Sequence, residues 1–226
     1  MGGGGRKKLC YGYALKADVR HYFDTVDHKI LLCIIERKIQ DKNILWLIRT
    51  ILENHKTDTV GKGMPIGNLT SQFFANVYLN ELDHFVKHKL RAKYYIRYVD
   101  DFVILHRDRK TLEKWRIRIN QFLKDTLKID LHTDKTRIVN LENGVTLLGF
   151  RMFYHYRLLK KSNTRRILRR FERFRKLYRN GLISKEEIIK RFDGWSAYAE
   201  FADTYNLRNK IITKYDDLLY ESTVSG

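Results

Sequence analysis

Two β-prone runs flank an acidic pair near the middle of the chain, and this pattern constrains the fold more than any other feature. The first run covers residues 94–99, the pair is Asp100 and Asp101, and the second run covers 102–105. Aromatic and β-branched residues on both sides of a short polar break predict a β-hairpin. The sequence therefore predicts a hairpin whose tip carries two carboxylates.

Upstream of this hairpin the chain alternates strand-like and helical patterns. Residues 13–19 are typical of a buried strand, with Asp18 at its end. Apolar residues then recur at helical spacing over 27–54, with an interruption near Asp41, which predicts two helices. After a glycine-rich loop, Thr70 or Ser71 is placed to cap a long helix.

Downstream the pattern continues and then changes. We expect a helix at 110–127, strand-like residues up to Val139, and a second hairpin around Gly144. From 157 to 179 the chain holds eleven Lys/Arg and a single acid, Glu172, with apolar residues at helical spacing. This is the pattern of a basic amphipathic helix, and more helical sequence follows it.

These patterns predict three parts: a flexible segment at 1–12, an α+β domain at 13–156, and a helical basic domain at 157–226. The whole chain has 45 Lys+Arg and 26 Asp+Glu, a net charge of +19. Such an excess favours a polyanionic partner. The alternative for the basic helix is a solvated face, although so many cations on one helix repel one another without a polyanion.

Composition argues against several classes of protein. A hydrophobic fraction of 43% is ordinary for a globular chain. No apolar run is long enough to span a membrane and no leader pattern opens the chain, so we expect no membrane association and a cytoplasmic location. Cys10 and Cys33 match no metal spacing. His84 and His88 stand four residues apart, as zinc ligands can, but without a third ligand exposed or capping histidines are the simpler interpretation.

The acidic residues indicate phosphate chemistry. Asp18 ends one strand and Asp100–Asp101 lie in the hairpin, so neighbouring strands could bring them together. Hard cations such as Mg²⁺ prefer oxygen ligands, and two such ions can promote an in-line displacement at phosphorus. The alternative is a polar turn and a strand cap, because Asp-rich turns are common.

The order of the motifs resembles the palm of reverse transcriptases of the prokaryotic retroelement and group II intron-like type. Those motifs are DVRHYFD at 18–24, GNLTSQ at 67–72, YVDD at 98–101, DKT at 134–136 and LGF at 148–150. Five motifs in order are far more specific than any one of them. The tail, with Gly194–Trp195, resembles the thumb of these enzymes. The resemblance implies an α+β polymerase palm, with a ferredoxin/RRM-like antiparallel sheet and packed helices, followed by a small helical thumb.

The resemblance also implies roles for the acidic residues. Asp18, Asp100 and Asp101 would be catalytic and would bind two Mg²⁺ ions, for which Mn²⁺ could substitute. The carbonyl of Val19 would complete the shell of one ion. Lys135, in the DKT motif, would approach the triphosphate as a catalytic proton donor.

Other residues would contact the nucleotide and the primer–template. Phe23 falls where the family has an aromatic steric gate that selects dNTPs, and it could equally be a plain core aromatic. The remaining nucleotide-binding candidates are Tyr22, Ile66 and Gly67. The primer- and template-binding candidates are Tyr98, Leu148, Gly149, Phe150, Arg165, Arg166, Arg169 and Arg173.

Two departures from the family pattern stand out. The loop 66–72 has an IGxxxSQ form, which looks like that of diversity-generating retroelement reverse transcriptases and predicts relaxed geometric discrimination near the nucleotide. In addition, only 17 residues precede Asp18, too few for the fingers subdomain, so we expect the fingers to be missing or supplied by a partner protein.

The predicted function is an RNA-directed DNA polymerase that copies an RNA template onto a DNA primer with dNTPs. One alternative is an inactive or fingers-deficient nucleic-acid-binding module, such as a maturase-like RNA binder or scaffold. Another palm-fold nucleotidyltransferase is a third, more remote possibility.

Overall fold

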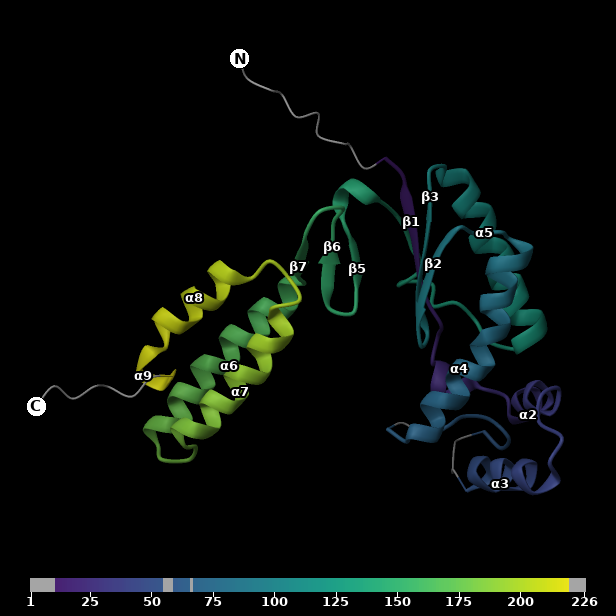
Figure 1. Cartoon of the computed structure of the whole chain (residues 1–226), viewed down its shortest axis with the longest axis horizontal. Coiled ribbons are helices and arrows are strands. Elements are labelled where there is room, and N and C mark those ends of the chain that lie inside the picture. The colour runs from purple at the N-terminus through teal and green to yellow at the C-terminus, as the bar shows by residue number, and fades with distance from the viewer. Residues whose placement is uncertain (1–10, 55–58, 66, 220–226) are drawn as a thin grey trace, which may run out of the picture. The chain divides into compact units, whose positions relative to one another are not determined.

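A computed structural model describes residues 11–54, 59–65 and 67–219 (Figure 1). Ile66 and most of the predicted N-terminal segment lie outside the described residues. The chain divides into two compact units, Met1–Glu142 and Asn143–Gly226, here called the N-terminal and C-terminal units. This division falls ahead of residue 157, where the charge composition changes. The assignment of 143–156 to the palm therefore stays a prediction.

The N-terminal unit is built on a four-stranded antiparallel sheet with the order β2-β3-β1-β4. Its strands are β1 (Tyr13–Asp18), β2 (Tyr94–Tyr98), β3 (Asp101–His106) and β4 (Arg137–Asn140). The predicted hairpin is confirmed as β2 and β3, joined by a two-residue turn. Asp18 lies directly opposite Asp101 across the central β1–β3 pair.

Two long helices cover one face of this sheet (Figure 1). They are α4 (Leu69–His84), which continues as the π-helical turn η1 (Phe85–Lys89), and α5 (Arg109–Phe122), which continues as η2 (Leu123–Leu127). Strand alternation places Leu15 and Ala17 in the core beneath these helices. Lys16 and Asp18 therefore belong to the opposite face.

Short helices complete the N-terminal unit. They are α1 (Tyr22–Thr25), α2 (His28–Glu36) and α3 (Lys42–Glu53), and the last two confirm the predicted helix pair. The predicted cap of α4 is wrong: Asn68 precedes the helix, and its side chain accepts a hydrogen bond from the backbone N–H of Thr70 at 3.2 Å. Asn68 has extended backbone angles, which an N-cap requires, whereas Thr70 and Ser71 are already helical.

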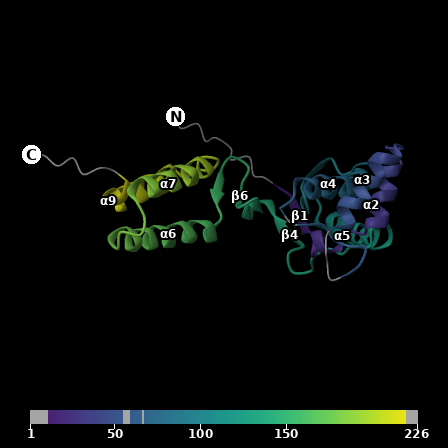
Figure 2. The same ribbon diagram turned by 90° about the horizontal axis from the view of Figure 1, so that it is seen from below.

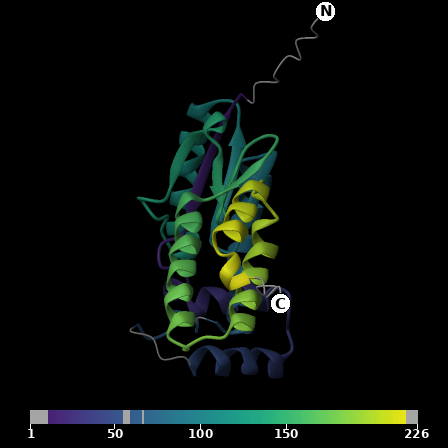
Figure 3. The same cartoon turned by 90° about the vertical axis from the view of Figure 1, so that its left-hand side faces the viewer.

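The C-terminal unit combines a small sheet with a group of helices, and the long helices of this group lie side by side (Figures 2 and 3). The sheet contains β5 (Val145–Leu147), β6 (Phe150–Met152) and β7 (Arg157–Leu159), and the turn η3 (Leu141–Asn143) precedes it. The helices are α6 (Lys161–Arg179), α7 (Lys185–Ala199), α8 (Tyr205–Lys214) and α9 (Asp216–Leu219). Their core is formed around Phe171, Ile188, Ile211 and Tyr215.

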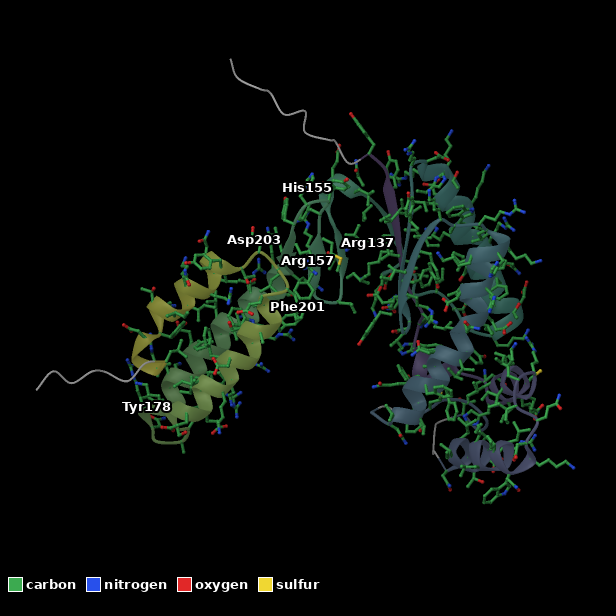
Figure 4. All side chains as sticks on the ribbon, in the orientation of Figure 1. Arg137, His155, Arg157, Tyr178, Phe201 and Asp203 are labelled. Carbon is green, nitrogen blue, oxygen red and sulfur yellow. The ribbon has the colours of Figure 1, made fainter. Side chains whose placement is uncertain are left out.

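Two expectations for this region are wrong. The second hairpin turns at Leu148–Gly149 and not around Gly144, because β5 pairs with β6 while Gly144 only leads into β5. The basic helix begins at Lys161, since 157–159 pair with β6 as strand β7. The loop after α7 returns to β7, where the N–H of Asp203 donates to the carbonyl of Arg157 at 2.7 Å (Figure 4).

Within the described ranges, no helix is long and apolar enough to cross a membrane.

Candidate active site

Three acidic residues lie near one another at one end of the N-terminal sheet. Asp18 ends β1, Asp101 begins β3 directly opposite it, and Asp100 lies in the turn beside Asp101. Burial raises the pKa of Asp100 above its usual value, and the negative charges of Asp18 and Asp101 raise it further. The fold thus places Asp18 opposite Asp101 with Asp100 in the adjacent turn, while their convergence on one ion and their catalytic roles stay predictions.

Two lysines contact these carboxylates. Lys135 Nζ lies 3.2 Å from Asp18 Oδ1, and Lys16 Nζ lies 3.1 Å from Asp101 Oδ2. Burial raises the pKa of Asp101, while the positive charge of Lys16 opposes that shift. Sequence reasoning named Lys135 but missed Lys16. The available signal was strand alternation, which puts Lys16 on the same face as Asp18.

The chemistry of the donors fits a divalent cation. Carboxylate oxygens are the ligands that Mg²⁺ and Mn²⁺ prefer, and Asp101 Oδ1 is buried without a hydrogen-bond partner among the described residues. However, no three His, Cys, Asp or Glu side chains in the described part of the chain group closely enough to hold an ion. His84 and His88 are exposed and stack on each other, with ring centroids 5.4 Å apart. The site thus offers suitable ligands whose charge the lysines partly balance.

The proposed carbonyl ligand lies just beyond β1. Val19 forms an isolated antiparallel bridge with Leu131, and its side chain is buried. The hydrogen bonds next to this bridge use the carbonyl of Asp18 and the N–H of Arg20. They therefore involve the neighbours of Val19 and not its own carbonyl.

The nucleotide-binding candidates differ in exposure. Tyr22 is only 2% exposed and donates its hydroxyl to the carbonyl of Ala75 at 2.6 Å, so its side chain is part of the core. Phe23 is partly exposed and packs edge-on against Tyr22, with ring centroids 5.7 Å apart. Gly67 has a φ of 90°, which favours glycine. Of the candidates within the described residues, Phe23 and Gly67 therefore offer accessible atoms, and Tyr22 packs against Phe23.

The primer-binding candidates fall in both units. Tyr98 is 59% exposed and, by its register opposite Asp101, stands on the open face of the sheet. Leu148 and Gly149 form the β5–β6 turn in the C-terminal unit, with φ values of 50° and 85°. Two φ values above zero suit the tight turn of a two-residue hairpin. Phe150 is nearly buried behind this turn.

Two helical residues that sequence reasoning missed hold that turn. Asn163 of α6 donates from Nδ2 to the Gly149 carbonyl at 3.2 Å, and the Tyr198 hydroxyl of α7 donates to the Leu148 carbonyl at 3.3 Å. The Tyr198 ring also packs against Phe150, with centroids 4.8 Å apart. The turn is therefore fixed to the helices of its own unit.

A row of arginines lies along α6. The predicted Arg165, Arg166, Arg169 and Arg173 are all exposed and line a surface groove together with Arg170. A second groove between α6 and α7 shares several of these residues and is also lined by Gly194, Trp195 and Tyr198. The C-terminal unit thus presents a concentrated positive surface with an aromatic border.

Comparison with known proteins identifies the family. The model of the reverse transcriptase (RNA-dependent DNA polymerase) family matches residues 6–152. Protein YkfC of Escherichia coli is 27% identical over 177 residues, covering 62% of this chain and 46% of that protein. Group II intron-encoded protein LtrA of Lactococcus lactis is 24% identical over 203 residues, covering 60% of this chain and 34% of that protein.

A solved structure agrees in fold. Apo telomerase from Candida tropicalis superposes with a TM-score of 0.52 at 17% identity, covering 65% of this chain and 32% of that chain. The chain thus spans less than half the length of these relatives. The N-terminal unit has the α+β fold of a polymerase palm. Since the family match covers well over half of the 226 residues, the chain belongs to the reverse transcriptase family, within its intron-type branch.

Proposed function

We propose that this chain is the palm (13–156) and thumb (157–226) of an RNA-directed DNA polymerase, which extends a DNA primer with dNTPs along an RNA template. The observation that carries this proposal is the pairing of Asp18 with Asp101 across β1 and β3, with Asp100 in the adjacent turn, in a chain of this family. Acids on two paired strands and in the adjoining turn favour metal-assisted phosphoryl transfer over a simple polar turn.

The carboxylates would hold the divalent cations. Asp18, Asp100, Asp101 and the carbonyl of Val19 supply oxygen donors of the kind that Mg²⁺ or Mn²⁺ takes. Two such ions, when bound, supply Lewis acidity at the primer hydroxyl and the phosphates. Lys135 Nζ lies 3.2 Å from Asp18 Oδ1, and from this position it would approach the triphosphate as a proton donor.

Selection of the sugar would depend on Phe23. Its ring is backed by the buried Tyr22, whose hydroxyl is itself fixed to α4 through Ala75. A ring held in this way would not move aside for the 2′-hydroxyl of an rNTP, which would clash with it, whereas the 2′-hydrogen of a dNTP would fit. Gly67 and Ile66 would border the same nucleotide from the loop before α4.

The arginines of α6 would hold the hybrid duplex. Exposed guanidinium groups release condensed counterions when they bind phosphates, which makes affinity strongly salt-dependent. The Leu148–Gly149 turn is fixed to α6 and α7, so it would contact the primer as one body with these arginines. Tyr98 would lie near the primer end, beside the carboxylates.

A second candidate function is binding of nucleic acid without polymerisation, as a maturase-like RNA binder or scaffold. The ion pairs of Lys16 and Lys135 favour it, because they balance the carboxylates with protein charges. In the relatives the matched region is also less than half of a longer protein.

Primer extension separates the two functions. We expect the purified chain to extend oligo(dT) on poly(rA) with dTTP and Mg²⁺, and the double variant Asp100→Ala/Asp101→Ala to lose extension while still binding the hybrid. Extension that survives the double substitution would refute the catalytic assignment. Salt-sensitive binding without any extension by the wild type would favour the second function.

A further inference from the structure

The turn that carries Asp100 has a strained backbone. Val99, its first residue, has a φ of 55°, in the left-handed region. Glycine and asparagine adopt this region readily, whereas a β-branched residue such as valine rarely does. Strain of this kind persists only where surrounding contacts hold it. The Val99 backbone therefore requires a neighbouring group that holds it in this conformation.

Arg97 is that group. It is on β2, two residues before Val99, and its side chain is only 9% exposed. Its Nη1 donates to the Val99 carbonyl at 2.7 Å and to Asn76 Oδ1 at 3.0 Å. The turn is thus bound to a guanidinium group that lies beneath the sheet and not in solvent.

The guanidinium is in turn anchored on α4. Its Nε donates to Asp83 Oδ1 at 2.8 Å, and Nη2 donates to Asp83 Oδ2, which makes a bidentate pair. The Tyr95 hydroxyl donates to the same Asp83 Oδ1 at 2.6 Å. Burial alone would lower the pKa of Arg97, but the hydrogen bond and charge of Asp83 outweigh it and raise the pKa. Arg97 is therefore charged at every working pH.

We propose that Arg97 is a positioning residue for the candidate active site: anchored on Asp83 of α4, it holds the Val99 carbonyl and so fixes the Asp100 carboxylate beside Asp18 and Asp101. This inference rests on the proposed function, since it names what positions the acids in that reaction. A displacement of about 1 Å at a reacting group can lower a rate about 100-fold, so the turn needs such support.

The sharpest variant is Arg97→Lys. Lysine keeps the charge but cannot make a bidentate contact with Asp83 and reach Val99 at the same time. Arg37→Lys is the matched control, because Arg37 also pairs with a carboxylate of α4, Glu81 at 3.3 Å, without touching the turn. A second variant, Asn76→Ala, removes one acceptor of Arg97 at an exposed position where folding is not at risk.

The kinetic arm measures kcat, KM for dTTP and hybrid affinity. We expect Arg97→Lys to lower kcat by about tenfold or more and Asn76→Ala by a smaller factor, with KM and hybrid affinity within about twofold of wild type. Arg37→Lys should match wild type. An unchanged kcat in Arg97→Lys, or an equal loss in Arg37→Lys, would overturn the proposal.

A second arm does not depend on activity. Hydrogen exchange of the Asp100 and Asp101 amides should speed up about tenfold or more in Arg97→Lys and not in Arg37→Lys. Mn²⁺ affinity, read by electron paramagnetic resonance, should fall in the same variant only. If the wild type extends no primer, the proposed function fails on its own. Hydrogen exchange then tests the role of Arg97 by itself. Faster exchange of the Asp100 and Asp101 amides in Arg97→Lys supports the positioning role, and equal exchange in Arg97→Lys and Arg37→Lys overturns it.

Discussion

Lys135 and Asp18, 117 residues apart in the sequence, form an ion pair in which Nζ lies 3.2 Å from one carboxylate oxygen and 3.3 Å from the other. Across the strand pair, Lys16 Nζ contacts one oxygen of Asp101, Oδ2, at 3.1 Å. Two carboxylates that face each other repel, and each lysine offsets part of that repulsion. Burial raises the pKa of Asp100, and the negative charges of Asp18 and Asp101 raise it further.

The raised pKa of Asp100 predicts a specific pH dependence of stability. Because the folded state binds this proton more tightly than the unfolded state, an ionised Asp100 destabilises the fold above its folded pKa. Asp100→Asn should therefore raise the melting temperature at pH 7 to 8. The difference should shrink as the pH falls through the raised pKa towards the ordinary value of about 4.

Asp108 provides the control with the opposite sign. It caps α5, and hydrogen bonds from Thr111 lower its pKa. Its contribution to stability is present at neutral pH and is lost as the pH falls, so Asp108→Asn should lower the melting temperature at pH 7. Thermal unfolding followed by circular dichroism checks both variants. A lower melting temperature for Asp100→Asn at pH 7 would contradict the conclusion that ionised Asp100 destabilises the fold.

Gly149→Ala should strongly destabilise the C-terminal unit. Gly149 has a φ of 85°, and an added Cβ would collide with the Tyr198 hydroxyl and lie 2.8 Å from Asn163 Nδ2. We expect a loss of roughly 2–4 kcal/mol from the left-handed backbone and overpacking together. Gly181→Ala is the control, since Gly181 has a φ of 69° but nothing within 4 Å of the added atom. It should cost only about 1 kcal/mol in chemical denaturation. Equal losses would show that the contact with Tyr198 is unimportant.

The sequence predicted the acidic hairpin well because its signal is local. Alternating side chains and a polar break determine β2 and β3, and the same alternation places Lys16 with Asp18 on one face. It also marks Arg97 as an inward residue, and a buried arginine needs an acceptor. Nothing local identifies Asp83 as that acceptor, because α4 precedes β2 and only tertiary packing brings the two together.

Boundaries were predicted less well, for physical reasons. A charge run does not determine secondary structure, so residues 157–159 could be joined to the basic helix although they pair with β6. Thr70 and Asn68 are both good cap residues, and the backbone angles that decide between them are not visible in the sequence. Gly144 and Gly149 both have positive φ values, but only Gly149 lies between strands that pair.

Phe23→Ala tests the sugar gate. Removing the ring opens space where a 2′-hydroxyl would clash, so incorporation of rNTPs relative to dNTPs should rise about tenfold or more. Phe201→Ala, at an exposed phenylalanine of the C-terminal unit, is the control and should leave the ratio unchanged. Competition between dTTP and UTP in primer extension gives the ratio directly. An unchanged ratio in Phe23→Ala would leave Phe23 as a core aromatic only.

The arginines of α6 predict the salt dependence of hybrid binding. Each side chain that neutralises one phosphate contributes about one unit to the slope of log K against log salt. Arg165→Ala and Arg169→Ala should each reduce the slope by about that amount. Arg49→Ala, which removes an exposed arginine paired with Glu36 in the N-terminal unit, should not change it. Fluorescence anisotropy at several salt concentrations gives the slopes, and identical slopes for all three variants would argue against the α6 surface.

Gly194→Ala should change protein stability and hybrid binding in opposite directions. Gly194 lies within α7, and an added Cβ there would meet nothing within 4 Å, so no described side chain requires a glycine. Alanine in a helix interior is favoured over glycine by about 1 kcal/mol, so the variant should be more stable.

The same position lines the groove between α6 and α7, close to Arg191 and Tyr198. If the hybrid backbone enters that groove, the added methyl group should weaken binding by about threefold or more without changing the salt slope, because no charge is altered. Ala197→Gly is the reciprocal control on an exposed site of α7: it should lose about 1 kcal/mol of stability and keep its affinity. Unchanged affinity in Gly194→Ala would place the duplex on the outer arginine row of α6 instead.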